Sequence, residues 1–416
     1  MFERTNPSGL SLDTASWASD SLQKITSLAS YGNDLSNLNT DLSPWKSSSS
    51  SVEVQSAEPL AQPQLGIKAN PNPNPYLNNA AIIPDFNGDG KADKVWANSQ
   101  TGEIVVWLMD GAKIASGASL GNYDLSSWSY KIADFNGDGK TDFFLQNKKT
   151  GENTVALMNG AQIASAVSLY KTDPAWTSSI GDFNGDRKTD IFWHNTQTGE
   201  NVIWQMDGTK IADGKALDKT DPSLTPTMVD FDSNGKTDVF WRNKATGENS
   251  VWFMNGTNAT KISLQKVDPS WDYTVGDFNG DLSSDILWRN TQTGENKIWQ
   301  INGIIVNEGV LPTLGSSWKS NIGDFNGDGK TDILWHNEST GENTAWLMNG
   351  TQVATEAILQ KNNPSSKVSL GDYNGDGKTD IFWRNYETGE NSIWQMNGTQ
   401  ATEAPINTVP KEWYTF

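Results

Sequence analysis

Residues 324–332 read Asp-Phe-Asn-Gly-Asp-Gly-Lys-Thr-Asp, and close variants of this stretch recur along the chain. The seven copies begin at Asp85, Asp134, Asp182, Asp230, Asp277, Asp324 and Asp372. Successive copies are 47 to 49 residues apart. A constant period of this length is typical of proteins in which each repeat is one supersecondary unit and neighbouring repeats stack. The repeats cover residues 79–416 and leave residues 1–78 outside.

Each repeat contains the pattern of four short strands. In the third repeat the apolar or alternating segments lie at 179–181, 191–195, 202–206 and from 210 onward. An Asp-Gly or Asn-Gly pair follows the third segment of each repeat and predicts a tight hairpin. No helical periodicity of useful length interrupts the strands. We therefore expect an all-β fold, a seven-bladed β-propeller of four-stranded antiparallel blades, whose ring closes without open edges.

The two ends of the repeat region predict how the ring closes. In four repeats a Trp stands six residues before the first loop Asp, whereas the first repeat has Asn79 there. These residues are Trp128, Trp176, Trp271 and Trp318. The C-terminal segment 410–416 resembles the segment around Trp176. We expect Trp413 and its neighbours to fill the vacant place in the first blade.

Every acidic loop carries oxygen-bearing side chains at positions 1, 3, 5 and 9. They are Asp85, Asn87, Asp89 and Asp93; Asp134, Asn136, Asp138 and Asp142; Asp182, Asn184, Asp186 and Asp190; Asp230, Asp232, Asn234 and Asp238; Asp277, Asn279, Asp281 and Asp285; Asp324, Asn326, Asp328 and Asp332; Asp372, Asn374, Asp376 and Asp380. Alternate spacing lets a tight loop aim its oxygens inward, and ligand sets made only of oxygen suit calcium. Asp, Asn and Gly also form ordinary turns, but seven copies favour metal binding. The sequence predicts up to seven Ca²⁺ ions.

Other metals and another calcium motif fit less well. Zinc would require His or Cys ligands, and magnesium tolerates such a cage poorly. An EF-hand needs a Glu at position 12 and a helix after it, but Trp193 and Trp335 stand there within strands. Position 6 is Gly in five loops, where we expect a positive φ. Arg187 and Leu282 replace that Gly, so we expect their two loops to bind calcium more weakly.

The composition excludes several classes of function. The formal charge of −19 and pI near 4.5 disfavour nucleic-acid and anionic-membrane partners. The chain has no cysteine and no run of 18 apolar residues that would predict a membrane span. Residues 1–78, rich in Ser, Asn and Pro, predict a mostly irregular arm or linker, including a stiff spacer at 70–75. The first 30 residues lack the apolar core of an ordinary signal peptide.

The loops, together with strand and turn phrases such as Phe-Trp-Arg-Asn at 240–243 and Thr-Gly-Glu-Asn at 246–249, resemble the FG-GAP/VCBS repeat family. The resemblance covers residues 79–416. It implies a fold similar to integrin α-chain heads and to seven-bladed fungal lectins, with calcium in the loops between first and second strands. It also implies adhesion or glycan recognition outside the cell. No sugar-contacting residue can be matched to a position in this chain.

Two further sets of repeated side chains have two interpretations each. Trp residues recur in the second and third strands, where packing between blades is favoured over sugar stacking. A His or Arg follows the second-strand position in five repeats: His194, Arg242, Arg289, His336 and Arg384. These five either pair with the turn Glu, as Arg242 with Glu248, or line a face that recognises a ligand. The pairing is favoured.

We expect a calcium-binding propeller that binds a glycan or another cell-surface or matrix ligand, as a lectin or adhesin, outside the cell or on its surface. The alternative is a structural subunit of an extracellular assembly that joins to itself through residues 1–78. A polysaccharide-processing enzyme ranks third. The two His residues occupy equivalent positions in different repeats, and no repeat carries a long insertion. We therefore expect no catalytic residues and no enzyme activity.

Overall fold

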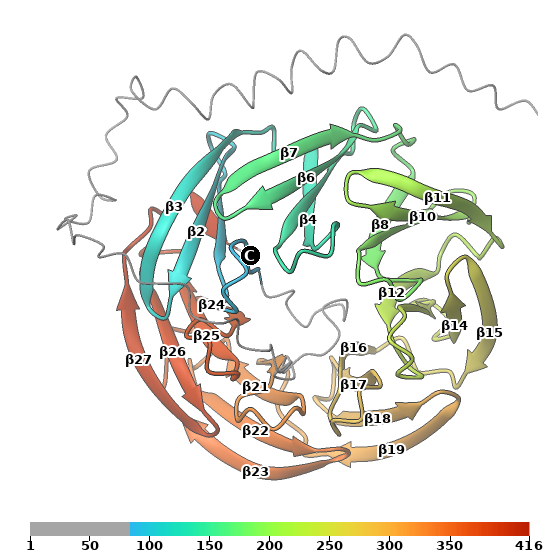
Figure 1. The fold of residues 1–416 in the computed structure, drawn as a ribbon. Coiled ribbons are helices and arrows are strands. Elements are labelled where there is room, and N and C mark those ends of the chain that lie inside the picture. Colours follow the sequence, from blue (N-terminus) through green and yellow to red (C-terminus); the bar gives the residue numbers. More distant parts are fainter. Residues whose placement is uncertain (1–83, 416) are drawn as a thin grey trace, which may run out of the picture. The chain divides into compact units, whose positions relative to one another are not determined.

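Each repeat folds as one twisted four-stranded antiparallel sheet in the computed structural model, which describes residues 84–415 (Figure 1). Seven such sheets form a ring, with the first strand of each blade nearest the axis and the fourth at the circumference. This confirms the predicted all-β, seven-bladed propeller. The interpretation of residues 1–78 as an arm lies outside the described residues. Within 84–415 there is no helix long and apolar enough to cross a membrane.

The strand bounds follow the repeat. They are, from the inner to the outer strand of blades one to seven, β28 (Trp413–Thr415), β1 (Lys94–Asn98), β2 (Glu103–Asp110), β3 (Lys113–Asn122); β4 (Trp128–Ala133), β5 (Asp142–Asn147), β6 (Asn153–Asn159), β7 (Gln162–Ser168); β8 (Trp176–Gly181), β9 (Asp190–Asn195), β10 (Asn201–Asp207), β11 (Lys210–Leu217); β12 (Thr225–Val229), β13 (Asp238–Arg242), β14 (Asn249–Asn255), β15 (Asn258–Leu264); β16 (Trp271–Gly276), β17 (Asp285–Asn290), β18 (Asn296–Asn302), β19 (Ile305–Leu311); β20 (Trp318–Gly323), β21 (Asp332–Asn337), β22 (Asn343–Asn349), β23 (Gln352–Leu359); β24 (Ser366–Gly371), β25 (Asp380–Asn385), β26 (Asn391–Asn397), β27 (Gln400–Ile406).

The C-terminal strand closes the ring as predicted. β28 pairs antiparallel with β1 and becomes the inner strand of blade one. Trp413 lies opposite Asn98, in the same register in which Trp176 lies opposite Asn195 in blade three. The two ends of the repeat region are therefore joined in one sheet, which leaves no open edge inside the ring.

Paired indoles fill the interior of six blades. The Trp of the second strand and the Trp of the third strand pack with ring centroids 4.8 to 5.3 Å apart. The pairs are Trp96–Trp107, Trp193–Trp204, Trp241–Trp252, Trp288–Trp299, Trp335–Trp346 and Trp383–Trp394. The second-strand members are at most 2% exposed, which confirms packing as the role of these indoles.

The five His and Arg residues connect adjacent blades, and both sequence interpretations of them were wrong. Arg242 is buried, and its guanidinium lies 4.7 Å from the Trp288 ring of the next blade. It donates hydrogen bonds to Asn249 Oδ1 (3.0 Å) and to the carbonyl of Trp271 (3.0 Å). Glu248 pairs instead with a surface lysine. The arginine has enough reach to satisfy carbonyls of the next blade, so it faces inward rather than toward the turn.

The same contact recurs around the ring. Arg289, Arg384, His194 and His336 lie 4.8 to 5.2 Å from the second-strand Trp of the following blade. All are at most 9% exposed. They therefore form no exposed face for a ligand, and their role is to hold blade to blade.

Candidate metal centres

In blades two to seven the acidic loop joins the inner strand to the second strand, and in blade one it leads directly into β1. The loop at 324–332 represents all seven. Asp324 at position 1 accepts backbone hydrogen bonds from Gly327 (2.7 Å), Asp328 (3.2 Å) and Gly329 (2.8 Å). Asn326 Oδ1 accepts from the amide of Asp328 (2.9 Å). These short-range bonds fold the loop around its own oxygens, as expected where Asp and Asn stand at alternate positions.

The carboxylate at position 9 ties the loop to the blade. Asp332 is fully buried and accepts hydrogen bonds from the amide of Phe325 (3.0 Å) and from the amide of Met348 in the third strand (2.8 Å). The equivalent Asp makes both bonds in all seven blades. Position 9 thus holds loop, second strand and third strand together, whether or not a metal binds.

Burial and mutual repulsion perturb these carboxyl groups. Burial raises the pKa of Asp93 to about 7, and the nearby charges of Asp85 and Asp89 add to the shift. The same causes raise the pKa of the other position-9 residues, to about 7 in Asp142, Asp190 and Asp380 and to about 8 in Asp238, Asp285 and Asp332. Burial also raises the pKa of every position-1 Asp, to about 7 in Asp230. Each loop therefore contains buried carboxyl groups whose negatively charged forms are destabilised.

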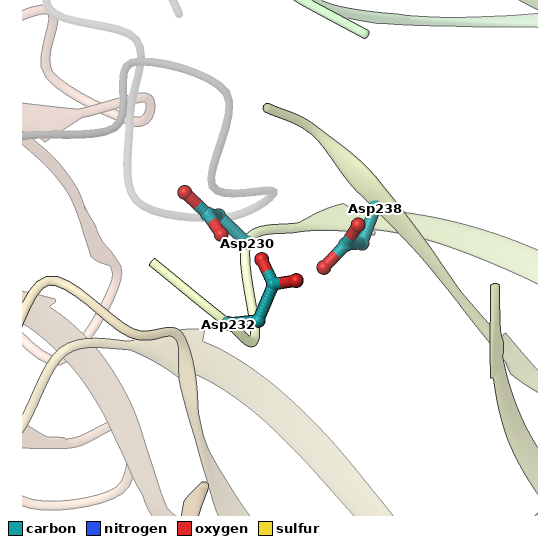
Figure 2. Close-up of side chains that lie close together, drawn as sticks. All are labelled: Asp230, Asp232 and Asp238. Atoms are coloured by element: carbon teal, nitrogen blue, oxygen red, sulfur yellow. The ribbon is translucent and has the colours of Figure 1, made fainter. Parts of the chain in front are cut away.

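The fourth loop brings its carboxylates closest together. Asp230, Asp232 and Asp238 each offer an oxygen within 4.8 Å of the others, and their side chains converge (Figure 2). Among residues 84–415 this is the one group of three His, Cys, Asp or Glu side chains whose ligand atoms all lie within 4.8 Å of one another. The reason is its sequence, since this loop has Asp at position 3 and Asn at position 5, whereas the other six have the reverse.

The donor set fits calcium. It consists of carboxylate and amide oxygens, without nitrogen or sulfur ligands. Burial, and to a smaller extent neighbouring carboxylates, raise the pKa values of these groups, and a bound divalent cation would stabilise their charged forms. In each loop the residues at positions 1, 3, 5 and 9 would hold the ion. The structure places all 28 predicted residues in equivalent loops of the seven blades, so they form seven separate candidate centres rather than one site.

The backbone at position 6 has the predicted conformation. The five Gly residues there have φ between 75° and 82°. Arg187 (φ 67°) and Leu282 (φ 70°) adopt the same left-handed conformation despite their side chains. Ser233 at position 4 of the fourth loop (φ 50°) is the remaining non-Gly residue with positive φ among residues 84–415. All three strained residues therefore lie in the acidic loops. Whether the loops with Arg187 and Leu282 bind calcium more weakly stays a prediction.

Sequence reasoning missed how the loops contact one another. The amide of Thr379 at position 8 donates to the carbonyl of Asp324 in the preceding blade (2.6 Å), and the amide of Gly398 donates to the carbonyl of Phe325 (2.7 Å). Both backbone bonds recur at all seven blade junctions. The loops thus form a continuous hydrogen-bonded circle. The available signal was the Thr that recurs at position 8 in five of the seven loops, whose hydroxyl accepts a hydrogen bond from the position-1 amide of the preceding blade in at least three of them.

Comparison with known proteins identifies the family. The family model described as FG-GAP-like repeat matches residues 85–145, 134–193, 182–241, 230–288 and 324–383, which is more than half of the chain. The protein belongs to this family of FG-GAP-like repeat propellers. No curated protein sequence matches the chain significantly.

One solved structure shares the fold over most of its length, and two others are more distantly similar. An Agrocybe aegerita lectin, described by its specific recognition of non-reducing terminal N-acetylglucosamine, aligns with a TM-score of 0.64 at 13% identity, covering 81% of this chain and 97% of the lectin. A Staphylococcus aureus virginiamycin B lyase aligns with a TM-score of 0.41 at 11% identity over 67% of this chain and 89% of its own. A putative 6-phosphogluconolactonase from Bacteroides uniformis gives 0.43 at 9% identity over 78% and 99%.

Proposed function

We propose that this protein is a calcium-binding propeller that recognises carbohydrate outside the cell. The observation that carries the proposal is the recurrence, in all seven blades, of a loop with three aspartates and one asparagine. Modules of this kind outside the cell bind calcium with dissociation constants of about 10⁻⁴ to 10⁻³ M. Resting cytosol holds too little calcium to fill such loops, which favours an extracellular location.

Recognition of carbohydrate is supported by two features. The first is the likeness to the Agrocybe aegerita lectin over nearly the whole of that chain. The second is a set of half-buried indoles at the starts of inner strands, since an indole offers an apolar face on which a sugar ring can stack. They are Trp128, Trp176, Trp271, Trp318 and Trp413. Unlike the second-strand indoles of the interior, which are at most 2% exposed, these keep part of their surface accessible.

The absence of catalysis is part of the same proposal. His194 and His336 are at most 3% exposed, and each Nδ1 is hydrogen-bonded to an Asn in its own blade, at 2.8 and 2.7 Å. Imidazoles held this way between blades do not reach a substrate at the surface. The non-Gly residues with positive φ among residues 84–415 all lie in the acidic loops, away from both His residues in the sequence.

A glycan array tests the proposal. The full chain should bind at least one class of glycan in 2 mM calcium and lose that binding in EDTA, and arrays should include glycans ending in N-acetylglucosamine. Trp271→Ala, Trp176→Ala and Trp318→Ala should each weaken binding, whereas Ile358→Ala on an outer strand should leave it unchanged. Absence of binding to every glycan in calcium would refute the carbohydrate proposal.

A further inference from the structure

Blade five differs from the other six blades in the large apolar side chains that it exposes. Among residues 84–415 seven large apolar side chains are exposed, and four of them belong to this blade. They are Leu282 (55%), Ile304 (68%), Ile305 (61%) and Val310 (82%). A single exposed apolar residue is ordinary on a protein surface, but a group of them in one blade of a repeating fold indicates a surface with a role of its own.

Three of these side chains replace small or polar residues of the repeat. The residue after the glycine of the outer hairpin is Ala or Thr in the other six blades and Ile304 here, and the next residue is Lys, Gln or Asn in the others and Ile305 here. Leu282 stands at position 6 of the acidic loop, where five loops have Gly. Lys and other polar side chains at the start of an outer strand discourage pairing with another chain, and blade five lacks them there. We call Leu282, Ile304 and Ile305 the blade-five patch.

The two segments that carry the patch meet at one atom of the fourth loop. The carbonyl of Phe231 accepts a hydrogen bond from the amide of Gly303 (2.6 Å), and the same oxygen lies 3.2 Å from the hydroxyl oxygen of Ser283. Leu282 precedes Ser283 in the chain and Ile304 follows Gly303. The exposed apolar residues of both segments therefore lie close together, beside the fourth loop.

The fourth loop presents carboxylates to this patch without the lysine found at the other loops. In six loops the glycine at position 4 is covered by the lysine at position 7 of the following blade, as Gly280 is by Lys330. In the fourth loop the corresponding residues are Ser233 and Ser283, whose hydroxyl oxygens are 3.3 Å apart. Asp232 is exposed in this loop, and its carboxylate converges with two others (Figure 2).

The formal charge of blade five indicates a basic partner. Residues 268–314, one full repeat, contain five Asp and two Glu but only one Arg and one Lys, which gives −5. The corresponding repeats that begin at residues 76, 125, 173, 221, 315 and 363 carry between −3 and +1. A second copy of this chain would bring surfaces of the same sign together, whereas a segment with Lys or Arg would be attracted.

We propose that the blade-five patch docks another protein through an extended segment that carries large apolar side chains together with Lys or Arg. The apolar side chains pack on Leu282, Ile304 and Ile305, and the cations face Asp232 and the neighbouring carboxylates of the fourth loop. The segment is extended because Ile305 begins β19, the outermost strand of its sheet, and an added strand can pair with the outer edge of such a strand.

This surface is separate from the indoles proposed to bind carbohydrate. Those indoles begin the inner strands, as Trp271 begins β16, whereas the acidic loops follow the ends of the inner strands. The patch lies beside the loops and therefore at the opposite end of the inner strands. Docking at the patch does not depend on carbohydrate recognition.

Peptide binding to the full chain tests the proposal. The probe is a fluorescent twelve-residue peptide of alternating leucine and lysine, and two comparison peptides replace every lysine by glutamate or every leucine by serine. The leucine–lysine peptide should bind at least ten-fold more tightly than either comparison peptide, and its affinity should fall as salt is added. Absence of measurable binding, or equal binding of the three peptides, would overturn the proposal.

Two variants restore residues that the repeat has in other blades, so both are expected to fold. Ile304→Thr combined with Ile305→Gln removes apolar contacts, and Ser283→Lys restores the cation at position 7. Each should weaken binding of the leucine–lysine peptide at least ten-fold. Ile358→Gln on β23, where the native side chain is 86% exposed, is the matched control and should leave binding unchanged. Equal affinities of the native chain and both patch variants would contradict the proposal.

Other occupants of the patch would give different results. If the patch joins two copies of this chain, sedimentation shows a dimer that Ile304→Thr with Ile305→Gln dissociates. If the patch contacts carbohydrate, the same double change abolishes binding on the glycan array. Either result overturns docking of a basic partner. The proposal predicts that the double change alters neither the oligomeric state nor glycan binding, so its failure is distinguishable from failure of the carbohydrate proposal.

Discussion

At the scale of single residues, Leu282 occupies a backbone conformation that favours glycine, and this strain destabilises its loop. Its φ of 70° is left-handed, and its side chain is 55% exposed, so little packing compensates. A non-Gly residue in this conformation costs about 1–2 kcal/mol, while Gly adds about 0.5–1 kcal/mol of unfolded-state entropy. We expect Leu282→Gly to be stabilising by about 0.5 kcal/mol and to tighten calcium binding at this loop. Calorimetric titration and thermal melts measure both.

Leu282→Ala is the matched control, because it removes the exposed side chain but keeps the strained backbone. It should leave the melting temperature and calcium affinity close to those of the native protein. If Leu282→Ala improves both as much as Leu282→Gly does, the backbone explanation is wrong. Arg187→Gly is expected to behave as Leu282→Gly does, since Arg187 has the same conformation.

The position-9 aspartates predict an unusual dependence of stability on pH. Their folded-state pKa values of about 7 to 8 lie above the unfolded value of about 3.9. Between about pH 4 and 7 the folded state therefore binds more protons than the unfolded state, so without calcium stability rises as pH falls through this window. With calcium bound the slope should reverse, because protons displace the metal. Melting temperatures from pH 8 to 5, in EDTA and in calcium, check both slopes.

Parallel curves in EDTA and in calcium would contradict the coupling of these carboxylates to metal. Asp332→Asn provides the residue-level control, since an amide cannot titrate but keeps an oxygen that can accept one of the two backbone hydrogen bonds. This variant should show a shallower slope in EDTA than the native protein. Asp110→Asn, in an exposed ion pair on blade one, should leave the slope unchanged.

At the scale of elements, the C-terminal strand β28 is the shortest of the inner strands that the structure describes. Only three residues of β28 pair with β1, and Arg384 supports them by donating to the carbonyls of Pro410 (2.8 Å) and Trp413 (2.9 Å). Deleting residues 411–416 should lower the melting temperature sharply. Arg384→Met should cost about 2–3 kcal/mol, because buried carbonyls lose their donor. Chemical denaturation measures the loss.

Arg289→Met serves as the comparison for Arg384→Met. Arg289 makes the equivalent contact between blades five and six, where the chain is continuous and the inner strand has six residues. Its loss should destabilise the protein less than the loss of Arg384. Equal losses of stability would show that the closure by β28 is no more sensitive than any other blade junction. An unchanged melting temperature after deletion of residues 411–416 would show that the ring does not need β28.

The sequence predicted elements better than it predicted the contacts between them. The period, the hairpin pairs and the Trp413 register depend on local pattern, and the structure confirms all three. The contact of Arg242 with the next blade was missed because its partners are backbone carbonyls, which every residue has and which no sequence pattern reveals. The hydrogen bond from the amide of Asp93 to the carbonyl of Pro84 and the pairing of Trp413 with Asn98 lie at opposite ends of the same blade-one strand region, and only the fold brings these two ends of the repeat region together.

At the scale of the whole molecule, the loop circle means that calcium should act on all blades together. Each loop is bonded to the next loop through the carbonyl at position 1, and its position-2 carbonyl is bonded to a hairpin glycine of the next blade, so distortion of one loop by carboxylate repulsion is transmitted to its neighbour. At 2 mM calcium and a dissociation constant of about 10⁻⁴ M, one site contributes about 1.8 kcal/mol. Several such sites imply that EDTA lowers the melting temperature by more than 10 °C, whereas magnesium at the same concentration restores little of it. Asp324→Asn combined with Asp332→Asn, which disables one loop, should reduce calcium binding by more than the one ion that loop would hold. A loss of only one ion would show that the loops act independently. A melting temperature that EDTA does not change would show that calcium does not stabilise this fold.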